Sequence, residues 1–292
     1  MSGLMTDVSE IGQRFDEDGF VILPGLMSAS VVDDVRRELS GWVDRFADDL
    51  VAKGVIASRF EEQPFETRLI NILRECPEKT PRELRRELHL AGLFGLFFHA
   101  GLLDVVECIL GPEIRLYPNY TVRPKLPESA ITEVPWHQDA AFTAAGRHGQ
   151  DPNAGALSAD RLRTVNVWTP LVPARRLNGC MQFIPASHKL GLVPHVERRF
   201  DYLEISEEVL GPRRSQAVDV AIDPGDVVLF SNLLFHVGLP NHSDSIRWSC
   251  DWRYQDARQS TMRSERGHLA RSQAQPQNVV RDASHWASLN FS

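Results

Sequence analysis

The sequence predicts a mainly β protein with α-helices near its N-terminal end, arranged as a sandwich or jelly roll. From residue 113 onwards, short apolar segments alternate with turns that contain Pro and Gly, and no long amphipathic helix separates them. Strands joined by turns rather than by helices argue against an alternating βαβ fold. The predicted strands span 114–122, 163–171, 181–184, 217–221, 227–230 and 246–254.

The N-terminal part is expected to form one strand and a helical buttress that packs against the sheet. The segment 15–24 is typical of an acidic turn followed by a short buried strand that a proline ends. Ser28 can cap a helix that runs to about Leu50, because apolar residues recur there at helical spacing. A second helical region is predicted for 81–110, with a break near Gly101.

The chain is expected to form a single domain over residues 1–292, since all-β domains of this length are common. The segment 141–160, rich in Ala and Gly, is predicted to be a long loop, and loops of this length are often functional. We interpret it as a lid, with a merely tolerated insertion as the alternative. The expected parts are the strand and buttress at 1–112, the jelly-roll core at 113–256 and a C-terminal extension at 257–292.

Composition excludes several classes of protein. The formal charge of -7 argues against a general polyanion binder, so no nucleic-acid partner is expected. The N-terminus has no apolar secretory signal, and no stretch approaches the ~20 apolar residues of a membrane span. Four scattered cysteines without a CxxC pair predict free thiols and a cytoplasmic location, and both a monomer and a homodimer fit the sequence.

A candidate metal site begins at Trp136-His137-Gln138-Asp139. On a strand, side chains two residues apart share a face, so an imidazole and a carboxylate would point the same way. Together they supply two thirds of a 2-His-1-carboxylate triad, which holds Fe(II) and leaves positions open. His236 follows a second apolar strand and is the candidate for the third ligand, and Arg247 lies on the next predicted strand.

With these residues in this order along the sequence, the chain resembles the phytanoyl-CoA dioxygenase-like branch of the Fe(II)/2-oxoglutarate-dependent oxygenases. The resemblance implies a double-stranded β-helix, cupin-like in its topology, with iron bound by His137, Asp139 and His236. It also implies that Arg247 grips the distal carboxylate of 2-oxoglutarate and that O2 is the second cosubstrate. It rests on the segments Asp-Gly-Phe-Val-Ile-Leu-Pro near the start, 136–139, 178–189, 225–230, and His236 followed by Asn241 and Arg247.

Several further residues are expected around the cosubstrate. An arginine such as Arg247 suits the binding of the distal carboxylate, because its planar guanidinium can donate two parallel hydrogen bonds to a carboxylate. The resemblance places Trp168 beside the cosubstrate, although a packing role stays open. Asn166 shares the face of Trp168 at period 2 and is a candidate hydrogen-bond donor, and Thr121 is a candidate polar contact. Gly238 departs from the family pattern, which often has a hydroxyl residue there, and Ser249 is expected to compensate.

The resemblance implies oxidation of a C–H bond with release of succinate and CO2. Asp139 favours hydroxylation over halogenation, because related halogenases have a small residue at that position. A small metabolite or natural-product intermediate is expected as substrate rather than an acyl-CoA, since no dense basic patch for nucleotide phosphates is evident. The candidate substrate contacts are Phe142, Arg147, His148, Arg253 and Tyr254.

Two other functions remain open from the sequence. A zinc or other divalent-metal jelly-roll protein could use the same three ligands, but it would not require Arg247. A catalytically silent barrel that only recognises a ligand would keep the fold without turnover.

Overall fold

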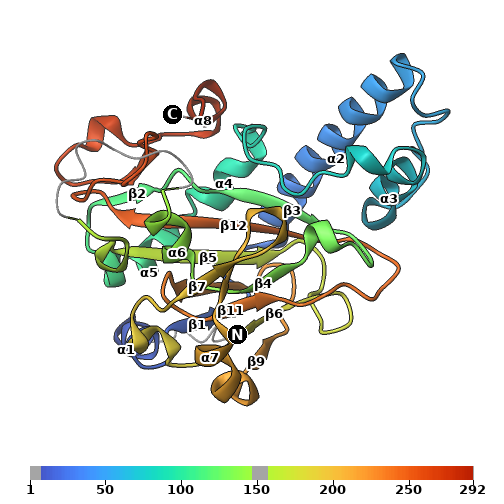
Figure 1. Ribbon diagram of the computed structural model, residues 1–292. Coiled ribbons are helices and arrows are strands. Elements are labelled where there is room, and N and C mark those ends of the chain that lie inside the picture. Colours follow the sequence, from blue (N-terminus) through green and yellow to red (C-terminus); the bar gives the residue numbers. More distant parts are fainter. Residues whose placement is uncertain (1–7, 147–156, 292) are drawn as a thin grey trace, which may run out of the picture.

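Two β-sheets form the double-stranded β-helix, as shown by the computed structural model, which describes residues 8–146 and 157–291 (Figure 1). The larger sheet has the order β1-β10-β5-β12-β2-β13, and β3 also pairs with β12. Its strands are β1 (Phe20–Leu23), β10 (Val227–Ser231), β5 (Thr164–Pro170), β12 (Arg247–Asp256), β2 (Ile114–Leu116), β13 (His268–Arg271) and β3 (Thr121–Lys125).

The smaller sheet has the order β4-β11-β6-β9, and a separate hairpin-like pair joins β7 to β8. The strands described here are antiparallel to their neighbours, which suits connections by turns. Their bounds are β4 (Val134–His137), β11 (His236–Gly238), β6 (Met181–Phe183), β9 (Val218–Val220), β7 (His195–Glu197) and β8 (Leu203–Ile205).

Helices lie mainly on the outer side of the larger sheet (Figure 1). The long helix α2 carries the predicted apolar stripe, and Val35 and Leu39 are fully buried in it. The α-helices are α1 (Val8–Asp18), α2 (Ala29–Ala52), α3 (Phe65–Glu75), α4 (Phe94–Phe97), α5 (Ala100–Leu110), α6 (Asp139–Ala144), α7 (Glu207–Leu210) and α8 (Ala283–Ser288), and short 3-10 turns include Pro77–Lys79, Ala91–Leu93, Ala130–Thr132, Ala159–Arg161, Ser187–Leu190, Gly211–Gln216 and Pro276–Asn278.

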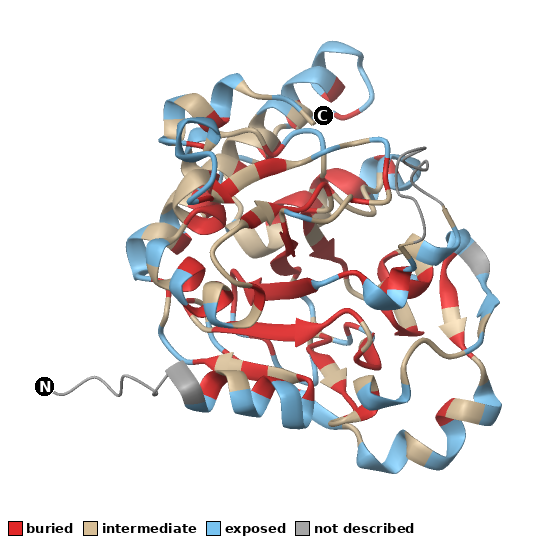
Figure 2. Ribbon diagram, turned by 90° about the vertical axis from the view of Figure 1, so that its left-hand side faces the viewer, coloured by how far each residue is buried: buried red, intermediate tan, exposed pale blue. Residues whose placement is uncertain are grey.

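The central strand β12 separates the core from the cavity. All ten of its residues are buried. Figure 2 shows buried strands in the interior and exposed segments mainly in the helices and loops around them. Trp248, Trp252 and Tyr254 point to the helical side, where they join the largest apolar cluster. Because side chains alternate along a strand, Arg247 and Arg253 point the other way, between the two sheets.

Most predicted strands are confirmed, but the predicted strand 114–122 is two strands. Pro118 has no backbone N–H to pair, and the chain turns there, with the Asn119 amide donating to the Tyr117 carbonyl at 2.6 Å. β2 therefore ends at Leu116, and β3 starts again at Thr121.

The predicted helical region 81–110 is also wrong in its first part. Leu84 exchanges two backbone hydrogen bonds with Val122, at 2.8 and 3.0 Å, so this segment runs beside β3 as extended chain. Helix begins only after residue 90, and the break falls at His99, whose ring accepts the Leu102 amide and caps α5. The turn expected at 15–18 is the last turn of α1.

The extension 257–292 adds strand β13 to the larger sheet and ends in α8 beside α4 (Figure 1). Trp286 of α8 is fully buried and stacks on His89, with ring centroids 4.0 Å apart. Within the described residues, no single helix is long and apolar enough to span a membrane. The bent pair Ala91–Phe97 and Ala100–Leu110 meets that test jointly, by length and composition.

Candidate active site

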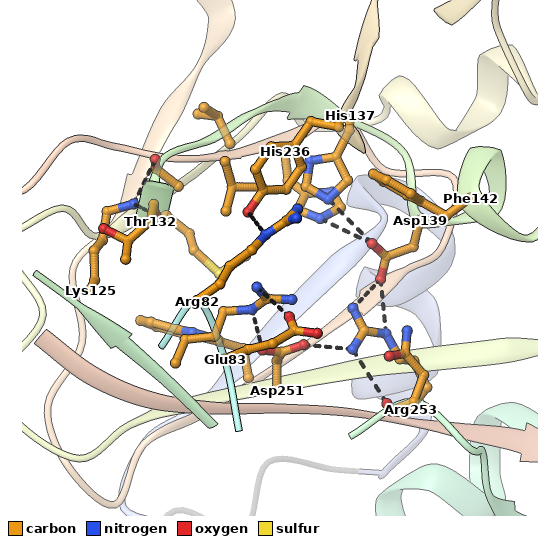
Figure 3. A pocket seen from close by; sticks show the side chains of 18 of the residues that line it. Arg82, Glu83, Lys125, Thr132, His137, Asp139, Phe142, His236, Asp251 and Arg253 are labelled. Carbon is orange, nitrogen blue, oxygen red and sulfur yellow. Dashed lines mark hydrogen bonds and ion pairs between the residues drawn. The ribbon is translucent and has the colours of Figure 1, made fainter. Parts of the chain in front are cut away.

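His137, Asp139 and His236 meet between the two sheets (Figure 3). One donor atom from each lies within 4.8 Å of the other two. Oδ1 of Asp139 is 3.3 Å from Nε2 of His137 and 3.7 Å from Nε2 of His236. The two histidines are cross-strand partners on β4 and β11, so the backbone pairing of the smaller sheet brings them together.

The prediction that Asp139 lies on a strand needs correction. β4 ends at His137, and Asp139 is the first residue of α6. Gln138 between them keeps extended backbone angles, φ -117° and ψ 134°, and the alternation of side chains therefore continues through the junction. The Gln138 side chain points away from the metal ligands and bonds the carbonyls of Gly191 and Leu233, at 2.8 and 2.6 Å, which anchors the junction.

Backbone carbonyls set the tautomers of both histidines. Nδ1 of His137 lies 2.8 Å from the Pro135 carbonyl, and Nδ1 of His236 lies 2.9 Å from the Leu234 carbonyl. A carbonyl can only accept, so each Nδ1 carries the proton and each Nε2 presents its lone pair to the centre. Burial and the neighbouring His137 lower the pKa of His236 to about 3, so this imidazole is neutral at physiological pH.

Asp139 is held from its other side by Arg253. Nε and Nη2 of Arg253 both donate to Oδ2 of Asp139, at 2.9 and 2.6 Å. Burial by itself would raise the pKa of Asp139, but Arg253 and the two histidines keep that pKa well below its ordinary value. The site therefore offers two imidazole Nε2 atoms and one ionised carboxylate, which is the donor set of a non-haem Fe(II) centre.

A cavity of about 630 Å³ opens from these ligands, and Arg247 lines it. The guanidinium of Arg247 donates a hydrogen bond to the hydroxyl of Ser249 and lies over the ring of Trp168, 5.4 Å from the ring centroid. Nε of Arg247 is buried and has no hydrogen-bond partner among the described residues. Burial lowers the pKa of Arg247 to about 10, so the group stays cationic at neutral pH.

Lys125 is a second buried basic residue in this cavity, and it was not among the residues expected there. Burial, together with the nearby Arg247, lowers the pKa of Lys125 well below its ordinary value. Its Nζ donates to the carbonyls of Thr132 and Gly238, at 3.1 Å each. A Cβ on Gly238 would lie 3.3 Å from this Nζ, so the lysine fills the space of the hydroxyl side chain expected there. Lys125 is the cross-strand partner of Arg247. The sequence carried no signal for Lys125, because the predicted strand ended at residue 122 and a lysine beside a strand is usually exposed.

Two of the polar residues expected around the cosubstrate lie elsewhere. Thr121 donates to Asp251 at 2.6 Å and does not line the cavity. Asn166 lines a second cavity of about 20 Å³ behind Asp139, where neither atom of its side-chain amide has a partner among the described residues. Its cross-strand partner is Arg253 rather than Arg247, which puts it beyond Asp139.

The candidate substrate contacts divide in the same way. Phe142 lines the cavity, and its ring meets that of His137 edge-on at 5.5 Å. Arg253 lines the cavity too, but it gives its N–H groups to Asp139 and Asp251. The expectation for Tyr254 needs correction, because its hydroxyl donates to the Phe97 carbonyl on the helical side. Arg147, His148 and the middle of the predicted lid lie outside the described residues.

The mouth of the cavity is lined by the extended segment before residue 90, which we had predicted to be helical. Arg82 lies over the ring of Tyr202, 3.9 Å from its centroid, and donates to the Tyr202 hydroxyl at 3.1 Å. The other charged residues at this end are Glu83, Arg85, Arg123, Glu197 and Asp201. Arg82, Glu83 and Arg85 belong to the region predicted to be helical, so the sequence did not place them at the cavity.

Comparisons with known proteins agree with this geometry. The family profile described as phytanoyl-CoA dioxygenase matches residues 15–249. A 1-deoxypentalenic acid 11-beta-hydroxylase from Streptomyces arenae is 27% identical over 267 residues, which cover 87% of this chain and 83% of the relative. The peroxisomal phytanoyl-CoA dioxygenase of Homo sapiens is 25% identical over 259 residues, which cover 84% of this chain and 68% of that protein.

Solved structures show the same fold. EctD from S. alaskensis, with 2-oxoglutarate and 5-hydroxyectoine, superposes with a TM-score of 0.60 at 21% identity, over 89% of this chain and 80% of its own. The non-heme monooxygenase ThoJ in its apo form also gives a TM-score of 0.60, at 20% identity, over 90% of this chain and 84% of its own.

Proposed function

This chain belongs to the phytanoyl-CoA dioxygenase family of Fe(II)- and 2-oxoglutarate-dependent oxygenases, and from that premise we propose that it hydroxylates an unactivated C–H bond of a small metabolite. The balanced reaction consumes O2 and 2-oxoglutarate and yields succinate, CO2 and the hydroxylated substrate. The observation that carries the proposal is one cavity that contains both the three metal-ligating residues and the buried Arg247.

The residues fit Fe(II). Two Nε2 lone pairs and one carboxylate oxygen converge, and each ligand is oriented by a second group. When bound, the metal together with 2-oxoglutarate and O2 supplies the oxidising power that attacks the C–H bond. His137, Asp139 and His236 would hold the metal, and the cavity that they line has room for the cosubstrate beside them.

The residues also fit 2-oxoglutarate. Nε of Arg247 lacks a partner in the described structure, and a buried donor of this kind is costly unless a ligand accepts from it. Lys125 places a second basic nitrogen on the neighbouring strand. A dicarboxylate that reaches from the metal position to Arg247 would satisfy this Nε, and Trp168 would hold the arginine in place from the side.

The substrate would bind between the metal and the mouth of the cavity. A volume of about 630 Å³ falls in the usual range for small-molecule sites. Phe142 and Phe230 provide apolar walls that exclude water near the metal, while Arg82 and Tyr202 provide polar contacts at the mouth. We therefore propose a natural-product intermediate or a similar small polar metabolite. The hydroxylation of 1-deoxypentalenic acid by one relative is consistent with this class.

Anaerobic titration and a succinate screen test the proposal. Fe(II) added with 2-oxoglutarate should give a weak visible charge-transfer band, which a zinc site cannot give. Under O2, a panel of metabolites should then be screened for substrate-dependent succinate release. Absence of the band would refute the oxygenase function and leave a zinc or divalent-metal protein. A band without succinate release under any condition would leave a silent ligand-binding barrel.

A further inference from the structure

A row of charged side chains with alternating sign leads from the metal ligand Asp139 to the mouth of the cavity (Figure 3). Arg253 joins Asp139 to Asp251, with Nη1 donating to Oδ1 of Asp251 at 2.6 Å. Arg123 donates from Nε to Oδ2 of Asp251 at 2.9 Å and reaches Oε2 of Glu83 at 2.8 Å. Five groups that would each be costly to bury alone are thereby paired.

The contact between Arg253 and Asp139 is asymmetric. Both Nε and Nη2 of Arg253 donate to the same oxygen, Oδ2, whereas Oδ1 faces the Nε2 atoms of His137 and His236. The lone pairs of Oδ2 are therefore engaged by a cation, and only Oδ1 is directed at the metal position. A bidentate carboxylate would need both oxygens on the metal and would fill a coordination position.

We propose that Arg253 is a positioning residue that restricts Asp139 to binding the metal through Oδ1 alone, and that Asp251 and Arg123 hold Arg253 in this role. The inference rests on the proposed function, because it concerns how that metal site stays open for cosubstrate and O2. Groups that orient metal ligands commonly change metal affinity by about 10- to 100-fold when they are removed.

Asp251 acts on Arg253 from the larger sheet. It lies two residues before Arg253 on β12, so its side chain shares the cavity face. Its Oδ1 accepts from Arg253, while its Oδ2 accepts from Arg123 and from the hydroxyl of Thr121. The three donors hold the carboxylate of Asp251 in one orientation. Its hydrogen bond to Arg253 in turn holds the guanidinium of Arg253 in place. This also explains why Thr121 turns away from the cosubstrate.

The test uses Co(II) as a spectroscopic stand-in for Fe(II) in the full chain. Arg253→Met should weaken Co(II) binding by about 10- to 100-fold and should alter the visible d–d spectrum as the second carboxylate oxygen reaches the metal. Arg253→Lys keeps the charge but loses the fork, so an intermediate effect is expected. Asp251→Asn should change the spectrum in the same direction, although Asp251 contacts none of the three ligands.

Arg68→Met provides the matched control. Arg68 is as buried as Arg253 and pairs with Asp44 at 2.6 Å, but it lies in helix α3, away from the cavity. This variant should lose thermal stability and leave Co(II) affinity and spectrum unchanged. If Arg253→Met does not fold, Arg253→Lys and Asp251→Asn carry the test. Wild-type affinity and spectrum in the folded variants would overturn the inference, whereas a missing Fe(II)–2-oxoglutarate band in the wild type would overturn the proposed function instead.

Discussion

The guanidinium of Arg247 lies over the indole ring of Trp168, 5.4 Å from its centroid. The two residues come from neighbouring strands, β12 and β5, and both face the cavity. Ser249 accepts a hydrogen bond from the opposite end of the same guanidinium. The arginine is therefore held in one orientation before any ligand arrives, which lowers the entropic cost of binding a carboxylate.

Arg247→Lys should weaken the binding of 2-oxoglutarate and leave the metal content unchanged. Hydrogen bonds to charged groups contribute about 1.5–3 kcal/mol each, so the Kd for 2-oxoglutarate should rise by roughly 10- to 150-fold. Cosubstrate titration of the anaerobic Fe(II) protein measures the change, and Trp168→Phe, which keeps an aromatic face, should have a smaller effect. An unaltered Kd would show that another group holds the cosubstrate.

His236→Ala should abolish metal binding, because the remaining imidazole and carboxylate supply only two of the three protein ligands. Metal analysis after anaerobic loading should find less than a tenth of the wild-type iron, because loss of a ligand should cost at least as much affinity as loss of a group that orients a ligand, which costs about 10- to 100-fold. His188→Ala is the control, since His188 is half-buried, interacts with the Asp16 carbonyl and does not line the cavity. Equal iron content in the two variants would contradict the assignment.

Phe142→Ala should loosen the coupling between cosubstrate consumption and substrate oxidation. The ring shields His137 from one side, and aromatic pairs of this kind contribute about 0.5–1.5 kcal/mol. The ratio of hydroxylated product to succinate should therefore fall by about 2- to 10-fold, with iron content unchanged. Phe142→Leu, which keeps apolar bulk, should retain most of the coupling, and a ratio insensitive to both changes would argue against the shielding role.

Stability should fall in acid because of His268. Burial, together with the nearby His89, lowers the pKa of His268 to about 4, and its Nε2 has no partner among the described residues. The unfolded chain binds a proton below about pH 6.5, whereas the folded chain does so only near pH 4. The free energy of unfolding is therefore unaffected by this group above pH 6.5. It decreases by about 3 kcal/mol as the pH falls from 6.5 toward 4.

Urea unfolding at pH 7 and at pH 4.5 measures this effect, and Trp286 fluorescence reports it locally, since His268 meets that ring edge-on at 5.3 Å. His268→Phe should have a flatter dependence on pH, because the group that titrates is removed. The same slope in both proteins would assign the acid sensitivity to other groups.

The fold was predictable where local patterns were strong. The strands around Trp168 and Val228 were found because apolar residues and turn signals bound them. The segment before residue 90 was misread as helix because its pairing with β3 depends on a partner nearly forty positions away, at Val122. Propensity gives no information on such a contact.

The sequence indicated which candidate ligands come together, and it indicated less about the residues around them. His137, Asp139, His236 and Arg247 were identified from residue type and order, and the structure brings them to one cavity. The roles of charged residues on strands were not visible, because a lysine or aspartate on a strand usually indicates an exposed edge. Their burial could be learned only from the assembled sheets.

Residue types, their order along the chain and the family resemblance were sufficient to select the candidate metal ligands and the candidate carboxylate-binding arginine. Only long-range packing decided that Arg253 faces Asp139, that Tyr254 faces the helices and that Asn166 lies beyond the cavity. The physical reason is that the face and depth of a strand residue depend on which strands pair beside it, and those partners are distant in the chain.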